Sequence, residues 1–147
     1  MPPTQDDLEK LIKPGAALFL KNIFSDSKLP HFHILLNYPL GTFADIASVN
    51  SSTNILGTKD LYESKPACLS ALIDSDKCEN TPFLTEKSIF DCNKPQILTK
   101  NLLFLKFEKG EWNLEKQSCV SPDFLKILIE ATRIGTGPKI VKNLFDF

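Results

Sequence analysis

The chain has 147 residues, of which 42% are hydrophobic and 24% are charged, a balance typical of one folded domain and unlike that of a disordered chain. Its 17 basic and 18 acidic residues leave a formal net charge of −1, which excludes a global field that would attract nucleic acid or an anionic membrane. Arg133 is the only arginine, so any RNA contact depends on a local patch in which lysine carries the charge.

The N-terminal segment is acidic and lacks an apolar core, so it does not resemble a secretory signal peptide. No apolar run approaches the roughly 18 residues that a membrane span needs. The four cysteines are widely spaced and form no C-x-x-C pair, which favours free thiols over disulfides. They are Cys68, Cys78, Cys92 and Cys119. We expect a cytoplasmic protein without a membrane contact.

The first half of the chain predicts strands after one short helix. Residues 6–12 predict a helix that Pro14 and Gly15 end, and residues 16–23 predict the first strand. Residues 31–38 give the clearest strand pattern, because two sets of side chains alternate along it. One set is Phe32, Ile34 and Leu36, and the other is His31, His33, Leu35 and Asn37. Residues 46–49 predict a third strand.

The second half is less regular. Residues 57–66 are polar and predict an irregular segment, and residues 67–73 form an apolar stretch of strand length. Residues 74–82 predict an exposed loop, and residues 83–92 one strand or two pieces of strand. Residues 102–108 and 111–114 flank Lys109 and Gly110, which predicts a hairpin.

The C-terminus changes to helical spacing. Ser121 is a candidate N-cap, Pro122 suits the first helical position, and an apolar stripe follows. Gly135 and Gly137 end this helix, and Pro138 begins a second one that continues to residue 146. Because strands precede helices, we expect one domain over residues 1–147, mainly β in an α+β arrangement: a small barrel over 13–120 with two short helices over 121–146.

His31 and His33 are the only histidines, and their spacing on a strand places both on one face, about 7 Å apart. Asn37 lies on the same face. Such a pair can supply a general acid and a general base near neutral pH. Two half-exposed strand residues without a function are the alternative. A metal site would need further ligands at recognisable spacing, so we expect no metal and no cofactor.

Residues 50–54 form a polar run directly after the third strand, with three hydroxyls and two amides that can bond a phosphate or a base edge. They are Asn50, Ser51, Ser52, Thr53 and Asn54. An ordinary turn is the alternative. The chain contains no Gly-rich phosphate loop, no G-x-S-x-G, no H-E-x-x-H and no H-x-E with C-x-x-C, which excludes the common NTPase, hydrolase and deaminase motifs.

Several short segments together suggest a family. They are K-P-G at 13–15, P-H-F-H-I-L-L-N at 30–37, the strand end at 49–53, T-P-F-L-T at 81–85 with S-I-F at 88–90, and S-P-D at 121–123. In this order they resemble the MazF/PemK-like toxins of type II toxin–antitoxin systems. The sequence departs from the family pattern in two ways. Ala16 stands where an acidic residue is common, and the strand that matches the family's arginine-bearing strand has no arginine.

The resemblance implies an SH3-like barrel that cleaves single-stranded RNA without a metal, forms a homodimer and is controlled by an antitoxin protein. It implies His31 or His33 as acid or base and Thr53 or Ser52 as the catalytic hydroxyl. Substrate binding would then fall to Asn37, Asn50, Ser51 and Asn54.

Two other interpretations remain. The first is a catalytically inactive SH3-like barrel that binds a protein or a nucleic acid, which the absent strand arginine and the near-neutral charge favour. The second is an unrelated α+β protein whose sequence indicates no function.

Overall fold

The computed structural model of the protein describes residues 3–21, 23, 30–39, 41, 44–75, 84 and 87–137. Seven strands form one antiparallel sheet in the order β4-β5-β3-β2-β1-β7, and β6 pairs with β3 beside this path. The strands are β1 (Ala16–Leu20), β2 (His31–Leu35), β3 (Ile46–Ser52), β4 (Leu72–Asp74), β5 (Ile89–Asp91), β6 (Gln96–Leu98) and β7 (Trp112–Cys119). The mainly β, α+β class is therefore confirmed.

β3 is the central strand of this sheet. One of its edges pairs with β2, and its other edge pairs first with β6 and then, at Ser51 and Ser52, with β5. Within the described residues, β4 and β7 end the sheet and do not pair with each other, so this pairing does not close it into the expected barrel.

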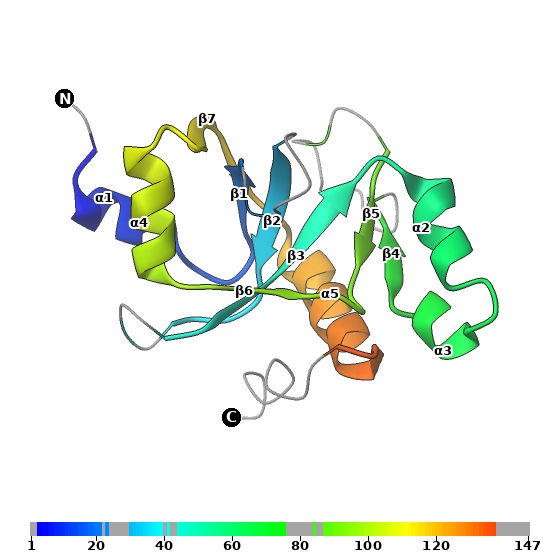
Figure 1. The fold of residues 1–147 in the computed structure, drawn as a ribbon. Helices are drawn as coiled ribbons and strands as arrows, with labels where there is room; N and C mark the ends of the chain where they lie inside the picture. Colours follow the sequence, from blue (N-terminus) through cyan, green and yellow to red (C-terminus); the bar gives the residue numbers. More distant parts are fainter. Residues whose placement is uncertain are drawn as a thin grey trace.

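Five helices lie around the sheet in the described part of the chain: α1 (Gln5–Glu9), α2 (Ile55–Leu61), α3 (Pro66–Leu69), α4 (Lys100–Glu108) and α5 (Pro122–Ile134). Figure 1 shows α1 and α4 on one side of the sheet, α5 on the other, and α2 with α3 beyond β4. None of these helices has the length and apolar character needed to cross a bilayer.

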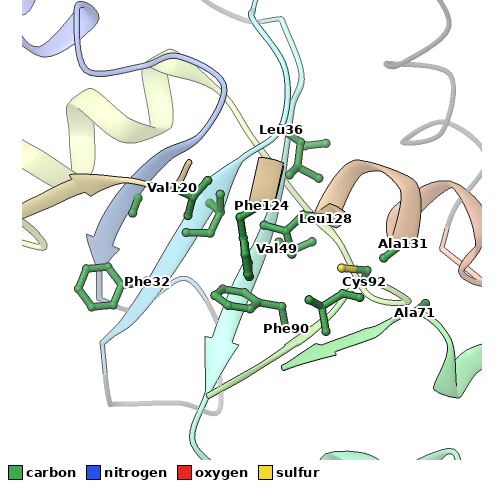
Figure 2. Close-up of a cluster of buried hydrophobic side chains, with 14 residues drawn as sticks. Phe32, Leu36, Val49, Ala71, Phe90, Cys92, Val120, Phe124, Leu128 and Ala131 are labelled. Carbon is green, nitrogen blue, oxygen red and sulfur yellow. The ribbon is translucent and has the colours of Figure 1, made fainter. Parts of the chain in front are cut away.

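Both faces of the sheet bury apolar side chains, because α5 covers one face and α1 with α4 cover the other. Where α5 packs on the sheet, the ring of Phe124 on α5 meets the ring of Phe90 on β5 edge to face, with centroids 5.7 Å apart (Figure 2). The opposite face packs Leu18, Leu35 and Leu103. A strand that is buried on both sides carries an almost continuous apolar run, which explains the sequence of β1.

The first C-terminal helix begins where the sequence predicts. The Ser121 hydroxyl accepts a 3.2 Å hydrogen bond from the Phe124 amide, and Pro122 occupies the first turn. The helix predicted from Pro138 onwards lies outside the described residues. So do residues 76–83, 85 and 86, which hold most of the predicted loop and part of the predicted strand at 83–92.

The predicted strand at 102–108 is wrong, because these residues belong to helix α4. The Thr99 hydroxyl caps this helix by accepting from the Leu102 amide at 3.1 Å, and Gly110, with a φ of 71°, follows its end. A short apolar run such as L-L-F-L-K-F fits a helix or a strand. The stable cap and the packing of Leu103 into the core decide in favour of the helix.

Two further expectations are corrected. Residues 57–66, expected to be irregular, contain most of α2, and residues 67–73 divide between α3 and β4 instead of forming one strand. Helices therefore occur along the whole chain and do not only follow the strands.

Candidate functional site

A half-open cleft of about 190 Å³ lies where β3 meets β5, next to helix α2. Most of its lining side chains are polar. They are Asn50, Ser52, Thr58, Asp91, Lys94 and Gln96, together with the apolar Leu61 and Ile89. The cleft thus combines hydrogen-bonding groups, one ammonium, one carboxylate and two aliphatic side chains.

Strand alternation explains why only part of the polar run at 50–54 reaches the cleft. Asn50 and Ser52 are two residues apart on β3 and share a face, and both line the cleft. Ser51 lies between them, points to the other face and is buried. The remaining polar lining comes from α2, from the end of β5, from the turn that follows it and from the start of β6.

Two hydrogen bonds from within the protein fix the Asp91 carboxylate. The Tyr62 hydroxyl donates to Oδ2 at 2.7 Å, and the Asn93 amide donates to Oδ1 at 3.0 Å. Burial of the Tyr62 phenol, and next the adjacent Asp91 carboxylate, raise the pKa of Tyr62 well above its ordinary value. The phenol therefore stays protonated and donates to the carboxylate at neutral pH.

Lys94 brings a positive charge to the cleft that no carboxylate neutralises in the described part of the chain. The ion pairs found there involve Lys59, Lys100, Lys106 and Arg133 instead. Lys94 is exposed, so its ammonium can reach a bound anion without first breaking an ion pair.

The turn that carries Asp91 and Lys94 is anchored by Asn93, which is buried. Its side-chain Nδ2 donates to the Cys68 carbonyl at 2.8 Å, and its Oδ1 accepts from the Thr136 backbone amide at 3.1 Å. The turn is thus fixed to α3 and to the segment that follows α5. A rigid turn keeps both charged side chains at one position relative to β3.

The two histidines share one face of β2, as predicted, but differ in exposure. His33 pairs with Leu18 and Asn50 across the sheet and is 0% exposed. Burial, and next the nearby His31, lower the pKa of His33 to about 3. His33 is therefore neutral at physiological pH and is poorly suited to proton transfer, so the half-exposed placement expected for both histidines is wrong for this one.

His31 is half-buried, and its Nδ1 lies 3.0 Å from the Ser51 carbonyl oxygen. Because a carbonyl oxygen only accepts, this bond assigns the proton to Nδ1 and the basic lone pair to Nε2. The bonded Ser51 carbonyl directly precedes Ser52, which lines the cleft. His31 is thus the histidine that the fold brings next to the cleft.

The other predicted site residues have structural roles or point elsewhere. Asn37 is buried; its Oδ1 accepts from the Ala47 amide at 2.7 Å and its Nδ2 donates to the Asp45 carbonyl at 3.1 Å. Asn54 is the N-cap of α2 and accepts from the Gly57 amide at 3.2 Å. Thr53 is exposed between β3 and α2 and does not line the cleft.

Four polar lining residues were not predicted: Thr58, Asp91, Lys94 and Gln96. Asp91 and Lys94 stand in a short polar turn, D-C-N-K-P, between two apolar segments, and polar turn residues of this kind are candidates for binding. Only the pairing of β3 with β5 and β6 shows that this turn faces the polar run at 50–52.

In the described ranges, no three side chains of His, Cys, Asp or Glu gather as metal ligands would. Cys68, Cys92 and Cys119 are free thiols, and burial raises the pKa of Cys92 to about 12. No model of a known protein family matches the chain. No curated protein matches it either.

Proposed function

We propose that the cleft binds one nucleotide of single-stranded RNA. The observation that carries this proposal is the Lys94 ammonium, which makes no ion pair in the described part of the chain and lies in a cleft lined by amides and hydroxyls. A phosphate attracts such a lysine as a point charge.

The rest of the lining suits an unstacked base. A base has two apolar faces and a polar edge, and single-stranded RNA displays all of these to a protein. Leu61, which is 64% exposed, offers aliphatic surface, while Asn50 and Gln96 offer amides that both donate and accept. Among the described residues that line the cleft, only Lys94 is cationic, so we expect few phosphate contacts and a shallow dependence of affinity on salt.

The resemblance to MazF/PemK-like toxins supports RNA as the ligand. An SH3-like barrel, a homodimer and control by an antitoxin belong to the same proposal. A cytoplasmic location fits the three free thiols at Cys68, Cys92 and Cys119.

Binding is tested by the fluorescence anisotropy of a labelled single-stranded RNA of mixed sequence, titrated with the purified protein. Lys94→Met should weaken binding and reduce the salt slope by about one unit. Lys126→Met is the matched control, because this exposed lysine lies on α5, across the sheet from the cleft. Equal losses in both variants, or a wild-type protein that binds no RNA, would reject the cleft as an RNA site.

A second candidate function, metal-independent cleavage of the bound RNA, is favoured by the tautomer of His31, whose Nδ1 bonds the Ser51 carbonyl. The Nε2 atom takes the proton of the 2′-hydroxyl, whose oxygen attacks the adjacent phosphorus. The bond to the 5′-oxygen breaks, and the proton passes to that oxygen. The products are a 2′,3′-cyclic phosphate and a 5′-hydroxyl, and Lys94 stabilises the negative charge that develops on the phosphate.

Cleavage is tested by incubating the protein with the same RNA in the presence of a chelator. His31→Asn should abolish cutting, and the anisotropy titration of the same variant shows separately whether RNA still binds. If folded wild-type protein binds the RNA without cutting it, the binding function stands alone. Cutting that His31→Asn retains would remove His31 from the mechanism.

A further inference from the structure

We propose that the cleft selects guanine among the RNA bases, through Asp91 and Lys94. This inference rests on the proposed RNA binding and adds the identity of the base. It follows from the geometry of one carboxylate and one ammonium that stand three residues apart in a turn, line the same cleft and form no ion pair with each other.

The Asp91 carboxylate is fixed but not saturated. Each of its oxygens accepts one hydrogen bond from within the protein, Oδ2 from Tyr62 and Oδ1 from the Asn93 amide. An ionised carboxylate has about four acceptor sites, so two remain for a ligand. A carboxylate held in this way presents a rigid pair of acceptors to the cleft and pays little entropy on binding.

Guanine is the base whose edge complements this pair of charges. It carries two neighbouring donors, N1–H and the 2-amino group, next to the acceptor O6, with the acceptor N7 on the adjoining edge. A carboxylate accepts from both donors, and a lysine, which has three N–H donors, donates to O6 or N7 while it also contacts a phosphate. The charges of Asp91 and Lys94 have the signs that this edge requires.

The other three bases fit less well. Adenine places an amino donor where guanine has O6, which would face the Lys94 ammonium. Cytosine offers one amino donor followed by two acceptors, and uracil offers a single donor between two acceptors, so each would direct an acceptor at the carboxylate. A buried or half-buried group that loses its partner costs affinity.

The test uses wild-type protein and heptamers of uridine whose central nucleotide is varied, measured by anisotropy. Central guanosine should bind about 5- to 150-fold more tightly than central adenosine, cytidine or uridine, as expected for one good bidentate base contact. Inosine, which lacks the 2-amino group, should fall between guanosine and adenosine. The analogue 2-aminopurine, which lacks O6 and N1–H, should bind as weakly as adenosine.

Two variants test whether Asp91 causes the preference for guanosine. Asp91→Asn should remove the preference for guanosine, so that the heptamer with central guanosine binds no more tightly than the all-uridine heptamer. Asp123→Asn removes an exposed carboxylate from the first turn of α5 and should keep the preference. The heptamer comparison on wild-type protein does not depend on how Asp91→Asn folds.

The outcomes separate the two proposals. Equal binding of all heptamers would overturn guanine selection and leave RNA binding in place. A guanosine preference that Asp91→Asn fully retains would also overturn the role of Asp91. Absence of binding to any heptamer would overturn the proposed function itself.

Discussion

The phenolic oxygen of Tyr62 lies 2.7 Å from Oδ2 of Asp91 and joins the end of helix α2 to strand β5. Tyr62 is only 7% exposed, so this bond reaches the cleft from the protein interior and leaves the cleft side of the carboxylate to a ligand. The same bond fixes α2, which contributes Thr58 and Leu61 to the lining. One partly buried hydrogen bond thus sets the position of two walls of the cleft.

Tyr62→Phe should therefore lower the free energy of unfolding by about 2 kcal/mol, because it removes a hydrogen bond to a charged group in a buried setting. Denaturant unfolding measures this loss. Tyr38→Phe is the matched control, since Tyr38 is 63% exposed, and its free energy of unfolding should stay within about 0.5 kcal/mol of wild type. A Tyr62→Phe variant as stable as the control would show that the bond does not hold the cleft together.

The buried His33 makes stability depend on pH below neutrality. Its pKa in the folded state, about 3, lies below the ordinary histidine value of 6.5, so between these pH values the unfolded chain binds a proton that the folded protein does not. The His33 contribution is present above pH 6.5 and is lost as the pH falls towards 3. Between pH 7.5 and pH 5, where few carboxylates titrate, the loss should be about 2 kcal/mol.

Denaturant unfolding at several pH values tests this dependence. His33→Gln should flatten the profile between pH 7.5 and pH 5, whatever its effect on absolute stability, and His31→Gln should keep the slope. An unchanged slope in His33→Gln would place the titrating group elsewhere.

Asn37 should matter for stability and not for RNA. Its side chain bonds the Ala47 amide and the Asp45 carbonyl, and Asn37→Ala leaves both groups without that partner, at a cost of about 1 to 3 kcal/mol. The anisotropy titration of the folded variant should match wild type, because Asn37 does not line the cleft. Weaker RNA binding at unchanged stability would restore Asn37 as a binding residue.

Local patterns explain what could be predicted from the sequence. Strand β2 and the start of α5 could be predicted because strand period and N-cap chemistry act within a few residues. The signals are the alternation at His31–Leu35 and the sequence S-P-D. Helix α4 escaped prediction because L-L-F-L-K-F is apolar almost throughout and shows no helical period, so only its packing against the sheet identifies it as a helix. In such runs, tertiary contacts decide the secondary structure, and the intrinsic propensity of the residues does not.

The cleft could be predicted only in part, for the same reason. The polar run at 50–54 predicted Asn50 and Ser52 as binding residues, although residues 50–52 belong to β3 and do not follow it. Asp91, Lys94 and Gln96 join them only through the pairing of β3 with β5 and β6. That pairing brings together residues about forty positions apart, and no pattern along the chain specifies it. The burial of His33 is likewise tertiary, because α1 and α4 cover the face on which it lies.

The most direct measurement of the central claim is a titration of isotope-labelled protein with single-stranded RNA, followed by amide chemical shifts in NMR spectra. RNA binding at the cleft predicts that shifts concentrate at residues 50–52, 58–61 and 91–96, which carry its lining, and spare the exposed side of α5. Shifts confined to α5 or β7, or no shifts at RNA concentrations above that of the protein, would contradict RNA binding at this cleft.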